Sequence, residues 1–405
     1  MKKIGFVIPW YGDKIPGGAE ADLRGLAKQM VKRGVEAEIL TTCVKEFSAD
    51  WGTDYYKPGT YEEGGLKVKR FPVRKRNKAA FDTVNYKLLN GQKRLSGEDE
   101  KTYINEMVNS PDLYQYIREH KDEYSVFAFI PYMFGTTYFG MQECPEKAVM
   151  IPCFHDESYA YLRCFGRVFP KAAGMAFHAA PERRLAEKLY DLKNVKLLNA
   201  GSGMDVDLTF DKERFRKKYE IQDPFILYAG RKDAGKNVDM LLTYFWEYKK
   251  RYKNGKNSNL KLVLLGGGNI TVPAGIKKDI LDPGFVPVQD KYDACGAAAF
   301  LCQPSRNESF SLVIMESWLC GRPVLVFEDC AVTKNFVQES NGGLYFKNYA
   351  EFEKTTDYLL EHEEISEQMG INGRDYVKEN FAWDTVVRKY LDFFREIAGE
   401  DGNGM

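Results

Sequence analysis

Hydrophobic positions along the chain form two kinds of segment that alternate from one end to the other. Short continuous apolar runs bounded by glycine or proline are typical of parallel strands that are buried on both faces. Such runs predict strands at 4–9, 37–42, 126–130, 148–152 and 195–198, and again at 225–229, 260–265, 298–302 and 323–327. Between them, apolar residues recur with the spacing of amphipathic helices, at 19–33, 181–189, 238–251, 309–320 and 365–379.

The order of these segments predicts an α/β fold. Strands that alternate with helices form βαβ units, and a chain of 405 residues is too long for one ordinary core. We therefore predict two doubly wound, Rossmann-like parallel-sheet domains. The boundary is placed at the glycine-rich residues 201–205, because a fresh strand pattern starts after them at Phe225. The predicted domains cover 1–203, with a charged helical insertion at about 81–121, and 204–382, with a last helix at 383–399.

Composition and charge then exclude several classes of protein. Apolar residues make up 44% of the chain and charged residues 29%, as in ordinary globular proteins. Lys+Arg and Asp+Glu are both 58, and we expect no nucleic acid partner because such a partner would require an excess of cations. The first apolar run is too short for a signal peptide, and no run reaches about 18 apolar residues, so we expect a cytoplasmic protein.

The cysteines and the paired aspartates give little support to a metal site. The eight cysteines contain no C-x-x-C pair and most lie in apolar surroundings, which favours buried free thiols over zinc ligands or disulfides. The pair Asp205-Val-Asp207 has a D-x-D spacing that can hold a metal, but it lies in the predicted linker, and we interpret it as structural. We therefore expect no metal and no other cofactor.

A glycine-rich stretch directly follows the first predicted strand. It runs from Trp10 through Gly17 and Gly18 to Glu20. Adjacent glycines between a strand and a helix let backbone amides and the helix N-terminus face an anion such as a phosphate. An ordinary flexible turn is the alternative, and two glycines do not exclude it. The stretch is not a G-x-G-x-x-G, so a dehydrogenase is disfavoured.

A second stretch in the same strand-to-helix position carries two cations. Arg231 and Lys236 follow the strand predicted at 225–229, next to Gly230 and Gly235. A guanidinium fork suits a bridging diphosphate, and a lysine adds a mobile point charge. The alternative is a solvated basic turn. Ligand crevices open at the carboxyl ends of parallel strands, which favours the diphosphate interpretation.

Two glutamates frame the helix predicted at 309–320. Glu308 precedes its first turn, and Glu316 is expected about two turns inside, roughly 12 Å further along the axis. This spacing would let one carboxylate meet the hydroxyls of a sugar and the other a ribose, with the helix N-terminus at a diphosphate between them. The alternatives are a first-turn acid that complements the helix dipole, for Glu308, and an exposed polar position, for Glu316.

A histidine with two neighbouring carboxylates follows the strand predicted at 148–152. Of the four histidines, only His155 lies at a strand end beside carboxylates, those of Asp156 and Glu157. From these residues alone, a satisfied structural histidine and a functional one are equally open.

A basic stretch runs from Lys67 to Lys78. Such a cluster is typical of a solvated edge strand and loop. It would also suit contact with anionic lipid at a membrane surface or with a polyprenyl-diphosphate acceptor, because clustered cations attract acidic head groups.

Taken together, these motifs resemble those of the retaining family 4 glycosyltransferases, which have the GT-B fold. Glu308 and Glu316 match that family's E-x7-E signature. Further matches are the Gly230-Arg231 to Lys236 turn with the donor-diphosphate clamp, Gly17-Gly18-Ala-Glu20 with the N-terminal glycine loop, Gly284-Phe285-Val286 with the loop at the nucleotide base, and Phe381-Ala-Trp383 with the segment that returns to the first domain. The resemblance is dense in the second half of the chain and thin in the first.

The resemblance implies a role for each candidate residue. His155 and Glu308 would be catalytic. Contacts to the donor diphosphate would come from Gly17, Gly18, Arg231, Lys236, Ser309, Phe310 and Ser311. Glu316 would bind the ribose, and Phe285 and Val286 the base. Acceptor contacts would come from Asp156, Glu157 and Glu20. The first domain would bind the acceptor and the second the nucleotide sugar, with the two domains facing across a cleft.

The activity implied is transfer of a hexose-type sugar, with retention of configuration, from a UDP- or GDP-sugar to a glycan or lipid-linked acceptor. Surface polysaccharide or glycoconjugate synthesis is the expected context, in the cytoplasm or peripherally at the inner face of the membrane. Two alternatives stay open. One is a nucleotide-sugar epimerase of the same architecture, and the other is a non-catalytic nucleotide-sugar-binding subunit.

Overall fold

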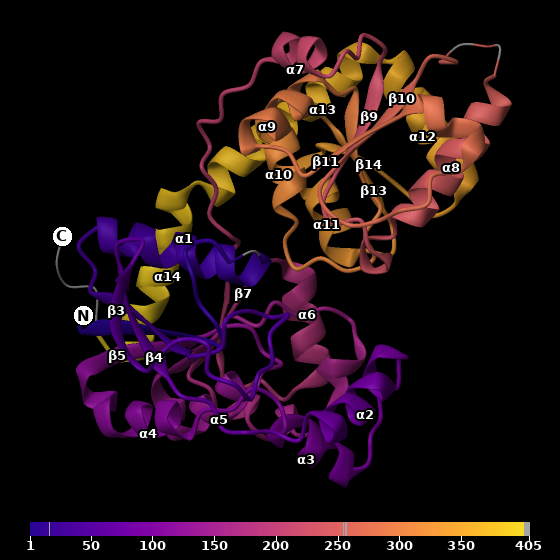
Figure 1. Ribbon diagram of the computed structural model, residues 1–405. Helices are drawn as coiled ribbons and strands as arrows, with labels where there is room; N and C mark the ends of the chain where they lie inside the picture. The colour runs from indigo at the N-terminus through magenta and orange to yellow at the C-terminus, as the bar shows by residue number, and fades with distance from the viewer. Residues whose placement is uncertain (16, 254, 256, 401–405) are drawn as a thin grey trace. The chain divides into compact units, whose positions relative to one another are not determined.

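The structure is a computed structural model that describes residues 1–400 except residues 16, 254 and 256 (Figure 1). The chain divides into two compact units. Unit 1 is Met1–Gly203 together with the segment that starts at Trp383, and unit 2 is Met204–Ala382. The last helix thus belongs to unit 1, although it follows unit 2 along the chain.

Unit 1 is built around an eight-stranded sheet with the order β3-β4-β2-β1-β5-β6-β7-β8. Its strands are β1 (Lys3–Ile8), β2 (Ala37–Thr42), β3 (Gly59–Glu63), β4 (Leu66–Phe71), β5 (Tyr124–Phe129), β6 (Ala148–Met150), β7 (Gly174–Phe177) and β8 (Lys196–Asn199). Neighbouring strands are parallel except for the antiparallel pair β3 and β4. The strand order reverses between β1 and β5, which marks a switch point at their carboxyl ends.

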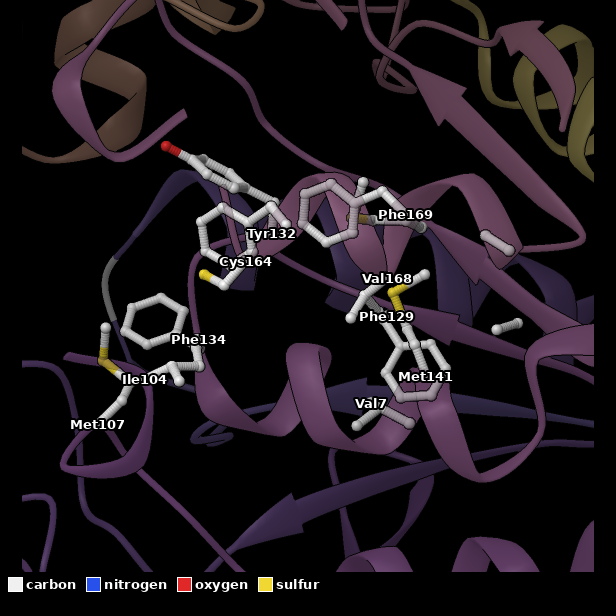
Figure 2. Packing of buried hydrophobic residues seen from close by; sticks show 14 of the residues in the cluster. Val7, Ile104, Met107, Phe129, Tyr132, Phe134, Met141, Cys164, Val168 and Phe169 are labelled. Atoms are coloured by element: carbon white, nitrogen blue, oxygen red, sulfur yellow. The ribbon is translucent and has the colours of Figure 1, made fainter. Parts of the chain in front are cut away.

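Helices cover both faces of this sheet. Side chains of α1 (Gly18–Lys32) and α14 (Trp383–Ala398) form one core with the sheet. The opposite face carries an aromatic-rich core, in which Val7, Phe129 and Met141 lie together (Figure 2). Each such side chain, when fully buried, stabilises the fold by about 1.5–3 kcal/mol. The other helices of unit 1 are α2 (Lys78–Leu89), α3 (Gly97–Asn105), α4 (Pro111–His120), α5 (Gly135–Glu143) and α6 (Ala180–Leu189), with short 3-10 turns at Lys121–Glu123, Pro145–Lys147, Ser158–Tyr161, Phe165–Arg167 and Phe169–Lys171.

Unit 2 has a six-stranded, fully parallel sheet with the order β11-β10-β9-β12-β13-β14. Its strands are β9 (Phe225–Ala229), β10 (Lys261–Leu265), β11 (Ile280–Gly284), β12 (Phe300–Gln303), β13 (Val324–Phe327) and β14 (Gly343–Phe346). Counted within the unit, this is the order 3-2-1-4-5-6 of a doubly wound dinucleotide-binding fold. The order reverses between β9 and β12, so the loops after these two strands border the switch point.

The helices of unit 2 lie on two sides of its sheet (Figure 1). Helices α8 and α12 pack together with one face, and α10 packs against α9 and α13 on the other. The helices are α7 (Lys212–Lys218), α8 (Val238–Arg251), α9 (Val288–Ala297), α10 (Leu312–Leu319), α11 (Ala331–Ser340), α12 (Tyr349–Glu361) and α13 (Glu363–Phe381), with 3-10 turns at Ala234–Lys236 and Ala274–Asp279.

The predicted fold class, two doubly wound parallel-sheet domains, is confirmed, and the eight cysteines are free thiols as expected. The interpretation of the basic stretch as an edge strand is wrong. Its strand, β4, pairs with β2 on one side and β3 on the other, and β3 forms the edge. The polar, exposed sequence of β3 carried no apolar run, so the pattern did not reveal it. Within the described part of the chain, no helix is long and apolar enough to cross a membrane.

Candidate functional site

The loops after β9 and β12 bring two of the predicted residues into direct contact. The strands are neighbours, with Ile226 beside Phe300. Nζ of Lys236, after β9, lies 2.7 Å from Oε1 of Glu308, after β12. The side chains of Lys236 and Glu308 are 22% and 11% exposed. Two motifs that are 72 positions apart in the sequence therefore form one partly buried ion pair at the switch point of unit 2.

A second contact fastens the same two loops together. Asn237 has a left-handed backbone with φ of 57°, and its Nδ2 donates to the carbonyl of Pro304 at 3.1 Å. Asparagine tolerates this conformation better than most residues. The turn that carries Lys236 is thus tied to the loop that leads to Glu308.

Glu316 lies inside α10 and is paired with a lysine that the sequence motifs did not reveal. Nζ of Lys291, on α9, is 2.5 Å from Oε1 of Glu316, whose side chain is 10% exposed. Burial raises the pKa of Glu316, and the charge of Lys291 acts against this rise. Glu316 is therefore a buried carboxylate and not the exposed polar position that was the alternative. The contact depends on the packing of α9 on α10, for which the sequence gives no local signal.

The helix predicted at 309–320 begins three residues later than expected. It starts at Leu312, because Ser311 takes a left-handed backbone with φ of 75°. Glu308 is therefore four residues outside the helix, and Glu316 lies about one turn inside it, roughly 6 Å from the start. The expected separation of two helical turns, and the interpretation of Glu308 as a first-turn acid, are both wrong.

The segment before α10 is anchored by a ring. The centroid of Phe310 lies 4.9 Å from that of Phe381 and 5.4 Å from that of Phe336, and the side chain is 5% exposed. Phe310 can therefore offer a ligand only its backbone. Ser309 precedes it in the same loop, and Ser311 is 8% exposed.

The other residues of unit 2 that are predicted to contact a nucleotide-sugar donor lie at its surface. The side chain of Arg231 is 79% exposed, and its Nε is 3.6 Å from Oδ2 of Asp233. Phe285 is 88% exposed, and Val286 beside it is half-buried. These side chains are open to a ligand from solvent, which distinguishes them from the paired Lys236 and Glu316.

A buried lysine that was not predicted connects the turn at Arg231 with the loop at Phe285. Lys232 is 4% exposed and forms an ion pair with Asp282. Asp282 also accepts a hydrogen bond from the backbone amide of Gly284 at 3.1 Å, directly before Phe285. The turn after β9 is thus held to the carboxyl end of β11.

In unit 1 the predicted glycine loop follows β1 and is closed by Glu20. Gly17 has φ of 147°, and a Cβ added there would lie 1.9 Å from Oε2 of Glu20. Oε1 of Glu20 accepts a hydrogen bond from Nε1 of Trp10 at 2.6 Å, and the residue is 8% exposed. Glu20 is therefore already engaged within the loop. A Cβ at Gly18 would meet nothing within 4 Å, so this position is open.

His155 follows β6 and is flanked by its own carboxylate neighbours. Nδ1 of His155 lies 3.6 Å from Oε1 of Glu157, which accepts a hydrogen bond from the hydroxyl of Tyr132 at 3.1 Å. Figure 2 shows the Tyr132 hydroxyl directed away from the apolar cluster that holds its ring. Asp156 turns instead toward Lys93, at 2.8 Å, and Tyr161. The structure thus groups Glu157 with His155 and leaves Asp156 at the surface.

Most cations of the basic stretch have partners within unit 1. Ion pairs join Lys67 to Glu38, Arg70 to Glu63, Arg74 to Glu106, Arg76 to Asp50 and Lys78 to Asp82. The charge that this surface offers to an anionic partner is therefore smaller than the sequence suggests. Among the residues that the structure describes, no group of three or more His, Cys, Asp or Glu side chains is placed to hold a metal, and Asp205 and Asp207 are both exposed.

Known proteins are similar to parts of this chain. The model of the family "Glycosyl transferases group 1" matches residues 211–376, most of unit 2. An uncharacterized glycosyltransferase of Methanocaldococcus jannaschii, MJ1607, is 24% identical over 202 residues, which cover 47% of this chain and 50% of that relative. A glycogen synthase of Thermus thermophilus is 27% identical over 196 residues, 46% of this chain and 42% of that enzyme. The chain thus spans about half the length of these curated relatives.

The structural likeness extends over the whole chain. Sucrose-phosphate synthase from Thermosynechococcus elongatus superposes with a TM-score of 0.70 at 14% identity, covering 99% of this chain and 100% of that one. The chain has the GT-B fold. The predicted fold is thereby confirmed at the level of the GT-B class, whose two Rossmann-like units are those described above.

Proposed function

We propose that this GT-B protein is a retaining glycosyltransferase of family 4 that transfers a hexose-type sugar from a UDP- or GDP-sugar to a glycan or lipid-linked acceptor. The observation that carries the proposal is the Lys236–Glu308 ion pair, at the switch point of a unit that matches group 1 glycosyl transferases. The proposal includes metal-independent transfer, a cytoplasmic location, and contact of the basic stretch with the inner membrane face, in surface polysaccharide synthesis.

The ion pair offers a simple exchange of partners when a donor binds. Glu308 balances the charge of Lys236 in the structure at 2.7 Å. A donor diphosphate is the stronger partner for an ammonium, because it carries more negative charge and several acceptor oxygens. Lys236 would then turn to the diphosphate, with Arg231 from the surface, and Glu308 would be released to accept hydrogen bonds from the hydroxyls of the sugar.

Glu316 is suited to a ribose because it combines charge with burial. Lys291 opposes the effect of burial and favours the ionised form, which can accept hydrogen bonds from two neighbouring hydroxyls. The exposed Phe285 and the backbone at Val286 would meet the base. Contact through the backbone would leave the choice between uracil and guanine to the shape of this loop.

In the proposed reaction the bond between the sugar C1 and the diphosphate oxygen breaks, and a bond from C1 to the acceptor oxygen forms on the same face. The proton of the acceptor hydroxyl passes to the departing phosphate. Lys236, Arg231 and the backbone amides at Ser309–Ser311 would stabilise the charge that develops on the leaving group. His155 would support the sugar near C1, and Gly17 and Gly18 would allow the backbone to approach the phosphate. We assign no protein nucleophile.

The proposal is tested by ligand binding followed by turnover. UDP, GDP and their sugars are screened for a rise in thermal stability, which reaches about 2.7 kcal/mol at a concentration of a hundred times Kd. The nucleotide that binds is then used as its sugar with a panel of acceptors, in the presence of excess chelator. We expect transfer with retained configuration. A new stereoisomer of the donor without any acceptor would indicate an epimerase, and binding without turnover a non-catalytic subunit.

A further inference from the structure

A buried network of charged side chains lies in unit 1 behind the segment that carries His155. Nε2 of His178, directly after β7, is 2.9 Å from Oδ2 of Asp22 on α1. The other carboxylate oxygen of Asp22 accepts a hydrogen bond from the hydroxyl of Ser202. Glu182 on α6 completes the network, with Oε2 3.9 Å from Nδ1 of His178. The side chains of His178, Asp22 and Glu182 are 3%, 10% and 0% exposed.

The carboxylate of Glu182 binds two backbone amides that are distant in sequence. Its Oε1 accepts from the amide of Phe154 at 2.6 Å, and its Oε2 accepts from the amide of His178 at the same distance. The second contact binds a backbone amide just before α6, whose N-cap residue Ala179 has no polar side chain that could cap the helix. The first contact reaches back 28 positions to the residue immediately before His155.

The backbone at this point is strained, and the network explains how it is held. Cys153 has φ of 57°, in the left-handed region that non-glycine residues rarely adopt. Such a conformation persists only where the surroundings fix it. Glu182 binds the next amide along the chain, that of Phe154. The network thus holds the turn that leads to His155.

Burying these charges is costly, which calls for a reason beyond packing. Burial raises the pKa of Glu182, although the charge of His178 and the two amides act against the rise. An apolar side chain at this position would avoid that desolvation cost. It would, however, leave the amides of Phe154 and His178 without these acceptors, and the turn before His155 without its support.

We propose that Glu182 is a positioning residue: its carboxylate fixes the turn at Cys153 and Phe154, and thereby the direction in which His155 presents its imidazole to the donor sugar. The inference rests on the proposed function, in which His155 contacts the sugar. The carboxylate of Glu157 lies beside the imidazole, with Oε1 3.6 Å from Nδ1. His155 is thus positioned through its backbone by Glu182, with Glu157 next to its ring.

The first test observes His155 directly and needs no activity. The chain contains four histidines, so the imidazole signals of ¹⁵N-labelled protein can be assigned by substitution. Glu182→Gln keeps the shape of the side chain, but its amide group replaces one of the two acceptor oxygens. We expect the His155 signal to shift, with the signals of His120 and His362 unchanged. A His155 signal that is the same as in the wild-type protein would overturn the proposal.

The second test separates positioning from a general loss of structure. Glu182→Gln should lower kcat about tenfold or more, with a smaller change in the KM of the donor, because misplaced catalytic groups cost rate. The same substitution should cost nothing further in a His155→Ala background, since residues that act as a unit are not additive. An equal loss in both backgrounds would overturn the proposal.

Controls guard both tests. Glu187→Gln lies on the same helix, in an exposed pair with Arg183 at 3.0 Å, and should change neither the His155 signal nor kcat. If Glu182→Gln does not fold, Glu182→Asp keeps the charge but withdraws the carboxylate from the amides, and the same shifts are expected. If the wild-type protein transfers no sugar, the proposed function fails, and the signal of His155 still decides whether Glu182 positions it.

Discussion

In unit 2 the carboxylate of Glu308 faces the ammonium of Lys236, whereas in unit 1 the carboxylate of Glu182 faces two backbone amides. The first contact joins two side chains that can each take another partner. The second joins a side chain to the main chain, and nothing that binds at the surface can replace it without unfolding the turn.

The difference indicates how each unit would respond to a ligand. In unit 2 the charges of Lys236 and Lys291 are balanced by Glu308 and Glu316, so the proposed diphosphate and hydroxyl groups would enter by exchanging partners. In unit 1, Glu20 and the turn before His155 are held in place beforehand by buried contacts. Substitutions in unit 2 should therefore act on binding and rate, and those in unit 1 on stability as well.

The largest effect is expected for Lys236→Ala. The substitution removes the cation at the proposed leaving group and should lower kcat/KM by about 10²–10³-fold, as loss of one charge-stabilising donor does in other enzymes. The unfolding midpoint should fall only modestly, because the side chain of Lys236 is 22% exposed and solvent screens part of the charge of Glu308 that is left unpaired. Steady-state kinetics and thermal unfolding measure both. Lys250→Ala, in an exposed pair on the neighbouring helix α8, is the control, and wild-type turnover of Lys236→Ala would contradict the assignment.

His178→Gln, in contrast to Lys236→Ala, should affect stability more than the rate of transfer. Burial alone would lower the pKa of His178, but the carboxylate of Asp22 raises it well above its usual range. A raised pKa contributes stability that is complete below about pH 6.5 and is lost as pH rises through the folded-state value. The variant should be less stable by about 3 kcal/mol at pH 6, and the gap should narrow in alkaline solution. Chemical denaturation at a series of pH values tests this, and a constant gap would contradict it.

Substitutions of the two glycines after β1 should separate an effect on stability from an effect on donor binding. Gly17→Ala should cost about 1–3 kcal/mol of stability, because it combines a positive φ with a clash at Oε2 of Glu20. Gly18→Ala meets no atom and should leave the unfolding midpoint unchanged, while donor affinity falls if a phosphate approaches there. Thermal unfolding and donor titration of both variants give the comparison. Unchanged donor binding in Gly18→Ala would remove this position from the site.

A smaller, pH-dependent effect is expected for Lys291→Met. Without Lys291, burial would raise the pKa of Glu316 further. Since the proposed ribose contact needs the carboxylate, donor binding should weaken at a higher pH on the acid side than in the wild-type protein. The dissociation constant of the nucleotide, measured between pH 5 and 8, shows the shift. Lys218→Met is the control. It removes the ion pair between Lys218 and Asp290 of α9, the helix that also carries Lys291, and should leave the pH profile unchanged.

The smallest effect concerns the basic stretch. Lys75 is exposed, whereas several of its neighbours have carboxylate partners. Lys75→Ala should weaken binding to vesicles with anionic lipid by at most about 1 kcal/mol, the contribution of one cation near such a surface. Cosedimentation at low and high salt measures it. If neither wild-type protein nor variant binds the vesicles, the proposed membrane contact is wrong.

Much of the fold could be predicted because central parallel strands are continuously apolar. The runs at 37–42 and 225–229 coincide with β2 and β9. Strand β11 was not predicted. It is half-exposed along its length and contains Pro283, so its sequence has no continuous apolar run. The start of α10 was misplaced because Phe310 continues the helical spacing, although its ring packs outside the helix on Phe381.

The candidate site likewise contains residues that the sequence predicted and residues that it did not. Lys236 and Glu308 could be found because each follows a strong strand, and the strand order places those strands side by side. Lys291 and Glu182 could not be found. Lys291 contacts Glu316, and Glu182 contacts the amide of Phe154, each on another segment of the chain. No local sequence pattern predicts such contacts.

The position of α14 has a consequence for how the protein is made. Its side chains Tyr390, Phe393 and Phe394 fill a core of unit 1. A ribosome must first synthesise about 180 residues of unit 2, which at about 5–20 residues per second takes roughly 10–40 s. During this interval the nascent first unit exposes an apolar sheet face. It therefore needs protection from aggregation until the last helix emerges, and a chain that stops early would leave that face uncovered.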